Sequence, residues 1–263
     1  MTSLEKLNLS EIQQLNPRAI NNFISQLAQN GFAIVKTDGF PERNAILRTL
    51  KDARKMETFR FPPHEHIGIY SEDQRESFRA FFKWTQICLT ALLKGLDPLE
   101  QHSADLKTSL GRTVDPDNLF PPNGKGNEPF VQGMEFSGSF FNVFHYDFGL
   151  LNAHRDRCLI TMVAVDQIQD NSTPKTALWA KGPAQNWINV DELVETGEII
   201  LFTGEDFEQR STQFGTPLPA AMHCTRVDPN AERLILFDDL PDPDSSTSNN
   251  RVSVAFVLSD TMM

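Results

Sequence analysis

The amino-acid sequence predicts a mainly β fold with flanking α-helices, in which N-terminal helices brace a β-rich barrel or sandwich. As far as residue 96, apolar side chains recur at the three- to four-residue spacing of a helix face. From Phe140 onward, short apolar runs separated by turn residues replace that pattern. The 263 residues are enough to bury one substantial core. We therefore expect one domain over residues 1–263, helix-rich in 1–135 and β-rich in 136–263.

The helical part contains three predicted helices and one strand. The first helix starts at Asn16-Pro17, a typical cap followed by proline, and stops before Gly31. The apolar stretch 32–35 follows as a short buried strand. Further helices are predicted over 41–56 and over 72–96, because both segments carry an apolar stripe.

Composition and charge limit the classes of partner. The chain has a formal net charge of −11 and no clustered lysines and arginines, which argues against a nucleic-acid partner. No stretch approaches the roughly 20 apolar residues that span a bilayer, and the N-terminus lacks a secretory signal pattern. We expect a cytoplasmic protein that acts on a small molecule.

The three cysteines have no Cys-x-x-Cys spacing, so neither a zinc knuckle nor a disulfide framework is implied. The oligomeric state is not encoded in these features.

The triplet His154-Arg155-Asp156 is the strongest chemical signal. In an extended strand, His154 and Asp156 project from the same face and can bind one metal ion. The apolar run 159–163 follows directly and predicts that the triplet enters a buried strand, with Arg155 on the opposite face. His223, 223 − 156 = 67 residues downstream, is the candidate third ligand. Two imidazoles and one carboxylate form the facial triad of non-haem Fe(II) enzymes.

A second signal lies near the C-terminus, where Arg251 and Ser253 share one face of a predicted strand. The planar guanidinium matches a carboxylate, and the serine hydroxyl can donate one more hydrogen bond. Together these residues are suited to hold the distal carboxylate of a 2-oxo acid.

In this order, His154-x-Asp156, His223 and Arg251-x-Ser253 resemble the 2-oxoglutarate and Fe(II)-dependent dioxygenases, specifically the isopenicillin N synthase-like branch. The resemblance extends to 30–36, 187–190 and 197–206. It implies a double-stranded β-helix, or jelly roll, whose His154, Asp156 and His223 bind Fe(II). It also implies 2-oxoglutarate as co-substrate, held by Arg251 and Ser253, and O2 as oxidant.

The sequence departs from the family pattern on the co-substrate side. Family members often carry Asn-x-Tyr before the first ligand, whereas this chain has Asn142-Val-Phe144, so the tyrosine hydroxyl is absent unless Tyr146 supplies it. Asn142 remains the candidate co-substrate contact in this motif. The interval from His223 to Arg251, 251 − 223 = 28 residues, is long for the family and is explained by a polar insertion over 238–250. Arg233 is a rival anchor for the keto acid.

Two other motifs imitate a metal site. His64-Glu-His66 follows two prolines and is expected in an exposed loop. His145-x-Asp147 repeats the ligand spacing but lacks the apolar continuation, so a role near the substrate is the alternative to metal binding.

The resemblance implies an oxygenase that hydroxylates, desaturates or cyclises a small molecule and releases succinate and CO2. Asp156 argues against the related halogenases, in which a small residue replaces the carboxylate. One alternative is an oxidase like isopenicillin N synthase, which needs no keto acid. Another is a non-catalytic jelly-roll protein whose histidines and aspartate are polar residues of a binding pocket. The substrate itself is not encoded by these motifs.

Overall fold

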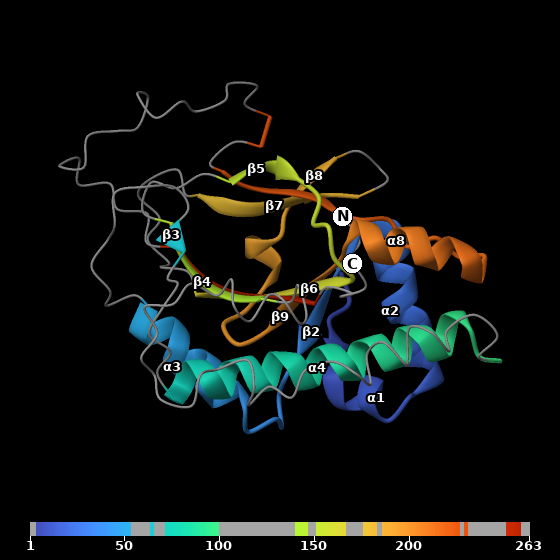
Figure 1. The fold of residues 1–263 in the computed structure, drawn as a ribbon, viewed down its shortest axis with the longest axis horizontal. Coiled ribbons are helices and arrows are strands. Elements are labelled where there is room, and N and C mark those ends of the chain that lie inside the picture. Colours follow the sequence, from blue (N-terminus) through green and yellow to red (C-terminus); the bar gives the residue numbers. More distant parts are fainter. Residues whose placement is uncertain are drawn as a thin grey trace.

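The computed structural model describes residues 4–53, 64–65, 72–99, 140–146, 151–166, 176–182, 186–226, 229–230 and 251–258. Two β-sheets face each other, and helices cover the outer side of the larger one (Figure 1). The prediction of a mainly β fold with flanking helices is confirmed. None of the helices described is long and apolar enough to cross a membrane.

The larger sheet has seven strands and the smaller one has four. The order in the larger sheet is β1 (Leu7–Asn8), β2 (Phe32–Lys36), β9 (Ile199–Thr203), β6 (Ile160–Asp166), β11 (Arg251–Leu258), β4 (Phe140–Tyr146) and β3 (His64–Glu65). The order in the smaller sheet is β5 (Leu151–His154), β10 (Met222–Arg226), β7 (Ala177–Lys181) and β8 (Trp187–Asn189). All neighbours pair antiparallel except β1 and β2. Strands β1 and β2 show that the N-terminal part also contributes to the larger sheet.

The N-terminal helices pack on the larger sheet. They are α1 (Leu9–Gln13), α2 (Pro17–Asn30), α3 (Arg43–Ala53) and α4 (Glu72–Leu96), with α8 (Glu205–Ser211) and the 3-10 turns η1 (Asp191–Leu193) and η2 (Thr212–Phe214) later in the chain. Helix α4 runs across the outer face of that sheet (Figure 1). Phe78 and Phe81 of α4 meet Phe256 of β11 with ring centroids 5.5 and 6.5 Å apart. This aromatic contact anchors the helical layer.

The boundaries of the helices follow the sequence signals closely. The side chain of Asn16 accepts hydrogen bonds from the backbone N–H groups of Arg18 and Ala19, and α2 ends at Gly31 in a left-handed conformation with φ 76°. Helix α4 has the predicted bounds. Helix α3 is shorter than predicted at the described end, starting at Arg43 instead of residue 41, while residues 54–56 lie outside the described residues.

The residues that face the space between the two sheets differ from those that face the helices. Along β11, Val252, Val254 and Phe256 belong to the large core under the helices, whereas Ala255 belongs to a smaller cluster between the sheets. Strand alternation therefore places Arg251 and Ser253 on the same interior face as Ala255. Both are buried, with 4% and 1% of their surface exposed. The interior between the sheets thus contains a buried guanidinium, that of Arg251, and the hydroxyl of Ser253.

Candidate metal centre

His154, Asp156 and His223 come together in the smaller sheet. His154 is the last residue of β5, Asp156 lies in the turn after it, and His223 is the register partner of His154 on the neighbouring strand β10. One potential ligand atom from each residue lies within 4.8 Å of the others. The two imidazole rings have centroids 4.3 Å apart. Side chains from two distant segments of the sequence therefore form one compact cluster.

The strand that follows the triplet differs from the prediction. The apolar run 159–163 belongs mostly to β6, and β6 lies in the larger sheet, not in the sheet that contains β5. The chain crosses from one sheet to the other between His154 and Ile160. Asp156 therefore sits in a crossing turn and does not share a strand with His154. The turn, rather than strand alternation, brings the two side chains together.

Backbone carbonyl groups fix both imidazoles in the same way. Nδ1 of His154 lies 2.7 Å from the carbonyl oxygen of Asn152, and Nδ1 of His223 lies 3.1 Å from that of Ala221. A carbonyl can only accept, so each Nδ1 carries the proton. The Nε2 atoms then face Oδ1 of Asp156, at 3.4 and 3.7 Å. At both histidines Nε2 is therefore the atom that faces Asp156. When protonated it donates to Oδ1, and when deprotonated it presents the lone pair that a metal ion needs.

A bulge in β5 contributes to this arrangement. His223 pairs with His154 and Thr225 pairs with Leu151, so three steps along β5 match two steps along β10. The extra residue lies where Asn152 turns its carbonyl oxygen toward the His154 ring. Bulges bend a strand and redirect its side chains, and they occur often beside active sites.

The second carboxylate oxygen of Asp156 has its own partner, which sequence reasoning missed. The hydroxyl of Thr161, the second residue of β6, donates to Oδ2 at 2.6 Å. This bond leaves Oδ1 facing the two histidines. The backbone carbonyl of Asp156 accepts from the N–H of Glu205 at 2.8 Å, at the start of α8. The only signal for Thr161 is its place five residues after Asp156, which has meaning only once the turn is known.

Gly204 permits the turn to pack against the end of β9. A Cβ atom at this position would lie 2.2 Å from the carbonyl oxygen of Cys158 and 2.7 Å from its Sγ atom. The N–H of Gly204 also donates to the carbonyl of Leu159 at 3.0 Å. The glycine is therefore needed for the close approach of two backbone segments, one of which carries Asp156.

Burial and neighbouring groups shift the pKa values of Asp156, His154 and His223 in different directions. Burial raises the pKa of Asp156, but the hydrogen bond with His154, the charge of His223 and the hydroxyl of Thr161 outweigh it and bring the pKa to about 2. The hydrogen bond to Asp156 raises the pKa of His154. Burial lowers the pKa of His223, although Asp156 acts in the opposite direction. The two histidines differ because His154 keeps more contact with solvent than His223, whose side chain is 8% exposed.

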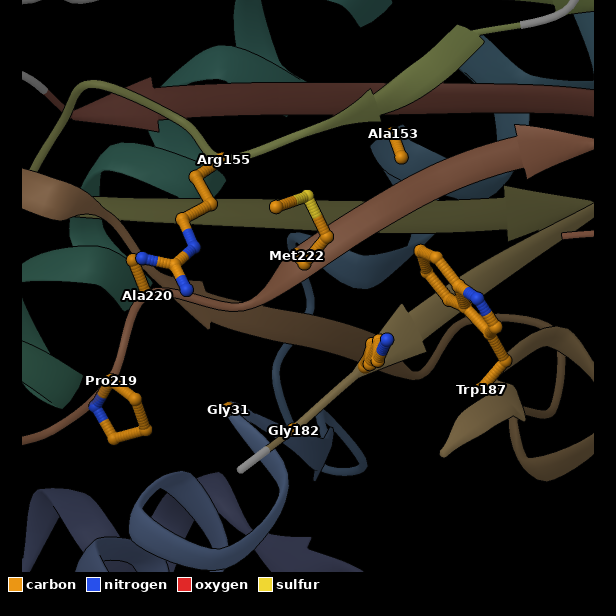
Figure 2. Close-up of a pocket in the computed structure, with 9 residues that line it drawn as sticks. Gly31, Ala153, Arg155, Gly182, Trp187, Pro219, Ala220 and Met222 are labelled. Carbon is orange, nitrogen blue, oxygen red and sulfur yellow. The ribbon is translucent and has the colours of Figure 1, made fainter. Parts of the chain in front are cut away.

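Arg155 and Arg157 do not join the cluster and contact α8 instead. Arg155 lies 3.8 Å from Glu208 and Arg157 lies 3.9 Å from Glu205, so both pair with acidic residues of α8. Arg155 also lines a cavity of about 420 Å³ on the outer face of the smaller sheet, together with Met222 and Trp187 (Figure 2). Ala153 and Met222 also line the cavity and alternate with His154 and His223 along β5 and β10, so it lies on the face of the sheet opposite the cluster.

The proposed anchor pair Arg251 and Ser253 is buried between the sheets, but Arg251 already has a carboxylate partner. Its Nε donates to Oδ2 of Asp191 at 2.7 Å, and its Nη2 donates to Oδ1 at 3.2 Å. Asp191 opens the turn η1 and is 3% exposed. Sequence reasoning did not identify this acid, because it comes from a segment 60 residues away.

Of the other candidate residues, some lie outside the described residues and some belong to β4 or β3. Arg233, Asp147, His66 and the polar insertion 238–250 lie outside the described residues. The backbones of Asn142, Phe144, His145 and Tyr146 belong to β4, where Asn142 pairs with Ala255, Phe144 with Ser253 and Tyr146 with Arg251. The expectation of a loop at His64 is wrong, because His64 and Glu65 form β3 and pair with β4 at the sheet edge. The role of Asn142 stays a prediction.

No protein-family model matches the sequence, and no curated protein matches it. The three-dimensional structure does resemble solved structures. A protein from Caulobacter crescentus assigned to the 2OG-Fe(II) oxygenase family aligns with a TM-score of 0.55 at 14% identity, covering 98% of this chain and 87% of that one. The dioxygenase for auxin oxidation in rice aligns with a TM-score of 0.54 at 14% identity, covering 97% and 83%. A full-length Neurospora crassa protein, solved in complex with α-ketoglutarate and 5-formyluracil, aligns with a TM-score of 0.50 at 11% identity, covering 99% and 86%.

These alignments extend over nearly the whole chain, and at such low identity they establish the fold. Sheet order, helix placement and structural neighbours agree with the predicted double-stranded β-helix. The chain therefore has the jelly-roll fold of the 2-oxoglutarate and Fe(II)-dependent oxygenases.

Proposed function

We propose that this protein is a non-haem Fe(II) oxygenase that uses 2-oxoglutarate and O2 to oxidise a small-molecule substrate. The observation that carries the proposal is the cluster of His154, Asp156 and His223, with ligand atoms within 4.8 Å of one another. A fold shared with such oxygenases supports it. Hydroxylation with release of succinate and CO2 is the expected reaction, with desaturation or cyclisation as variants.

The cluster meets the chemical requirements of a divalent iron site. Both imidazoles present Nε2, and Asp156 supplies an anionic oxygen between them. Two nitrogens and one oxygen on one side of an ion leave open positions on the other side. Bound Fe(II) would activate O2 with electrons from the keto acid. Within the chain, His154, Asp156 and His223 hold the ion, and Thr161 keeps the carboxylate from rotating.

The interior face of β11 is the proposed position for the far end of the keto acid. Arg251 supplies a guanidinium and Ser253 supplies a hydroxyl on the same face. Burial in this space excludes water and strengthens each polar contact. A small substrate agrees with two of the neighbours, since the rice protein is a dioxygenase for auxin oxidation and the Neurospora protein was solved with 5-formyluracil.

The buried Asp191 favours a second candidate. If Asp191 keeps Arg251 engaged at all times, the protein would act as an oxidase like isopenicillin N synthase, which takes its electrons from the substrate. The two candidates share the metal site and differ in one product. Succinate is formed only when the keto acid is consumed.

Metal binding tests what both candidates share. Anaerobic calorimetric titration with Mn(II), a redox-stable substitute for Fe(II), should show one site in the wild-type protein. His223→Ala and Asp156→Ala should abolish this binding, because each removes a ligand. Arg157→Ala is the matched control, since its side chain lies beside the site but is 92% exposed. Wild-type binding that persists in both ligand variants would overturn the proposed iron site.

Product analysis separates the candidates. Protein loaded with Fe(II) should convert 2-oxoglutarate to succinate in air, slowly without substrate and faster with one. Succinate formation that requires His154, Asp156 and His223 supports the oxygenase. Intact keto acid in the presence of a substrate that is itself oxidised supports the oxidase.

A further inference from the structure

A buried carboxylate binds the guanidinium that the proposed function assigns to the co-substrate. Asp191 and Arg251 are 3% and 4% exposed, and they form two hydrogen bonds, of 2.7 and 3.2 Å. The contact uses the Nε–Nη2 edge of the guanidinium in a side-on, bidentate geometry. Arg–carboxylate pairs of this kind are among the strongest hydrogen-bonded ion pairs in proteins.

The aspartate is held from a second direction. The backbone N–H of Leu178, on β7, donates to Oδ2 of Asp191 at 2.9 Å. Asp191 therefore links a strand of the smaller sheet to Arg251 on the larger sheet. A carboxylate with partners on both sheets is fixed in place, and it cannot leave the guanidinium without losing these contacts.

The pair lies close to the metal cluster along the sheet. Ala180 is the register partner of His223, and Leu178 lies two residues away on the same strand. Two residues of extended strand span roughly 7 Å. Ala180 and Leu178 both belong to the cluster between the sheets. The Asp191–Arg251 pair and the triad therefore share one interior space, separated by about the length of a short keto acid.

The charge of the pair determines what this end of the space can accept. Arg251 alone would present one positive charge to a ligand. With Asp191 the charge of the pair is zero, and a ligand carboxylate placed there would lie beside a second carboxylate. In a buried site, two anions near one cation repel each other strongly. A ligand with a neutral end meets no such repulsion, and the hydroxyl of Ser253 on the same face remains suited to it.

We infer that Asp191 is a specificity-determining residue, a built-in counter-ion that lowers the preference of the site for a keto acid with a distal carboxylate. The inference rests on the proposed function, because it concerns the keto acid bound at that iron site. Wild-type protein should distinguish only weakly between 2-oxoglutarate and 2-oxopentanoate, which has a methyl group in place of the distal carboxylate. Removal of the charge at Asp191 should create a marked preference for 2-oxoglutarate.

The test is anaerobic titration of Mn(II)-loaded protein with each of the two acids. The ratio of their affinities should be within about tenfold for wild type and should rise by about tenfold or more in Asp191→Asn. Asparagine keeps the size of the side chain and an acceptor oxygen for Leu178. Glu198→Gln is the matched control, since Glu198 is a buried acid, 5% exposed, that pairs with Lys6 and not with Arg251. This control should leave the ratio unchanged.

A ratio that is unchanged or lower in Asp191→Asn overturns the inference and makes Asp191 a residue that only positions Arg251. A wild-type preference for 2-oxoglutarate above about a hundredfold overturns it even if the variant fails to fold. Binding of neither acid to metal-loaded wild type and variant also overturns it. If wild type fails to bind Mn(II), the proposed function is overturned and not this inference. The ratio of the two affinities is then measured on metal-free protein, from the shift that each acid causes in the unfolding midpoint.

Discussion

Replacement of Thr161 by valine should weaken metal binding without disturbing the fold. The Thr161 hydroxyl donates to Oδ2 of Asp156 at 2.6 Å, and Thr161 is 4% exposed. Valine has the same shape and suits a strand such as β6. The substitution therefore removes the hydrogen bond to the carboxylate and a weaker contact with Sγ of Cys158 at 3.3 Å, and it changes the packing very little.

The size of the effect follows from the charge and burial of the acceptor. A hydrogen bond to a charged group contributes about 1.5–3 kcal/mol. The Asp156 side chain is 19% exposed, so water partly replaces the lost hydroxyl and the lower end of this range applies. The bond is already present in the metal-free protein, so its loss weakens binding by the cost of returning a freed carboxylate to the orientation that faces the histidines. That cost is at most the energy of the bond, and about 1.4 kcal/mol corresponds to a tenfold change in affinity. We expect Thr161→Val to bind Mn(II) about tenfold more weakly, at the lower end of the losses of about 10–100-fold that follow changes behind a metal ligand.

Anaerobic calorimetry with Mn(II) measures this change, and two variants control it. Thr161→Ser keeps the hydroxyl and should bind nearly as well as wild type. Thr85→Val removes a buried hydroxyl that contacts the sulfur of Met162, at 3.2 Å, and leaves Asp156 untouched. Thr161→Val binding within about twofold of wild type, or equal weakening in Thr85→Val, would show that the Thr161 hydroxyl does not support the metal ligand.

Three further predictions concern packing and protonation. Gly204→Ala should lower both the thermal unfolding midpoint and the Mn(II) affinity, because its Cβ would lie 2.2 Å from the Cys158 carbonyl oxygen; unchanged values for both would contradict the close approach. Phe256→Ala should reduce the free energy of unfolding by about 3–5 kcal/mol in urea titrations, since this buried ring joins β11 to α4, and a loss below about 1 kcal/mol would show that the helical layer does not depend on it. Mn(II) affinity should fall as the pH decreases from about 8 to 5, because the raised pKa of His154 lets protons compete for the ligand nitrogen. Asp156, with a pKa of about 2, stays ionised over this range. An Mn(II) affinity that does not change with pH would contradict this.

Local signals in the sequence were sufficient for α2 and α4, whereas α1 and α8 were not predicted. Asn16 and Gly31 mark the two ends of α2 because capping depends on neighbouring residues alone. The apolar stripe of α4 predicts its bounds for the same reason, since periodicity along one helix requires no knowledge of its partner. Where the prediction depended on pairing, it was weaker: His64 was expected in a loop and pairs with β4.

In the candidate site, too, local motifs could be predicted and contacts between distant segments could not. The spacing His154-x-Asp156, with His223 and Arg251-x-Ser253 in order, indicated the fold and nominated the ligands. The sequence did not show that the chain crosses between sheets at Asp156, and it did not identify Thr161 or Gly204 as the residues that hold this turn. Those contacts join segments that meet only when the two sheets pack.

The residue types of a facial triad, their order along the chain and helices α2 and α4 could all be predicted from the sequence. The carboxylate that meets Arg251 became known from the fold. Asp191 has no motif of its own, and it reaches Arg251 because η1 and β11 lie on opposite sides of the same interior. A short-range sequence pattern shows which side chains a segment can contribute to a site. The partner of a buried charge is set by long-range packing, which brings together residues 60 positions apart.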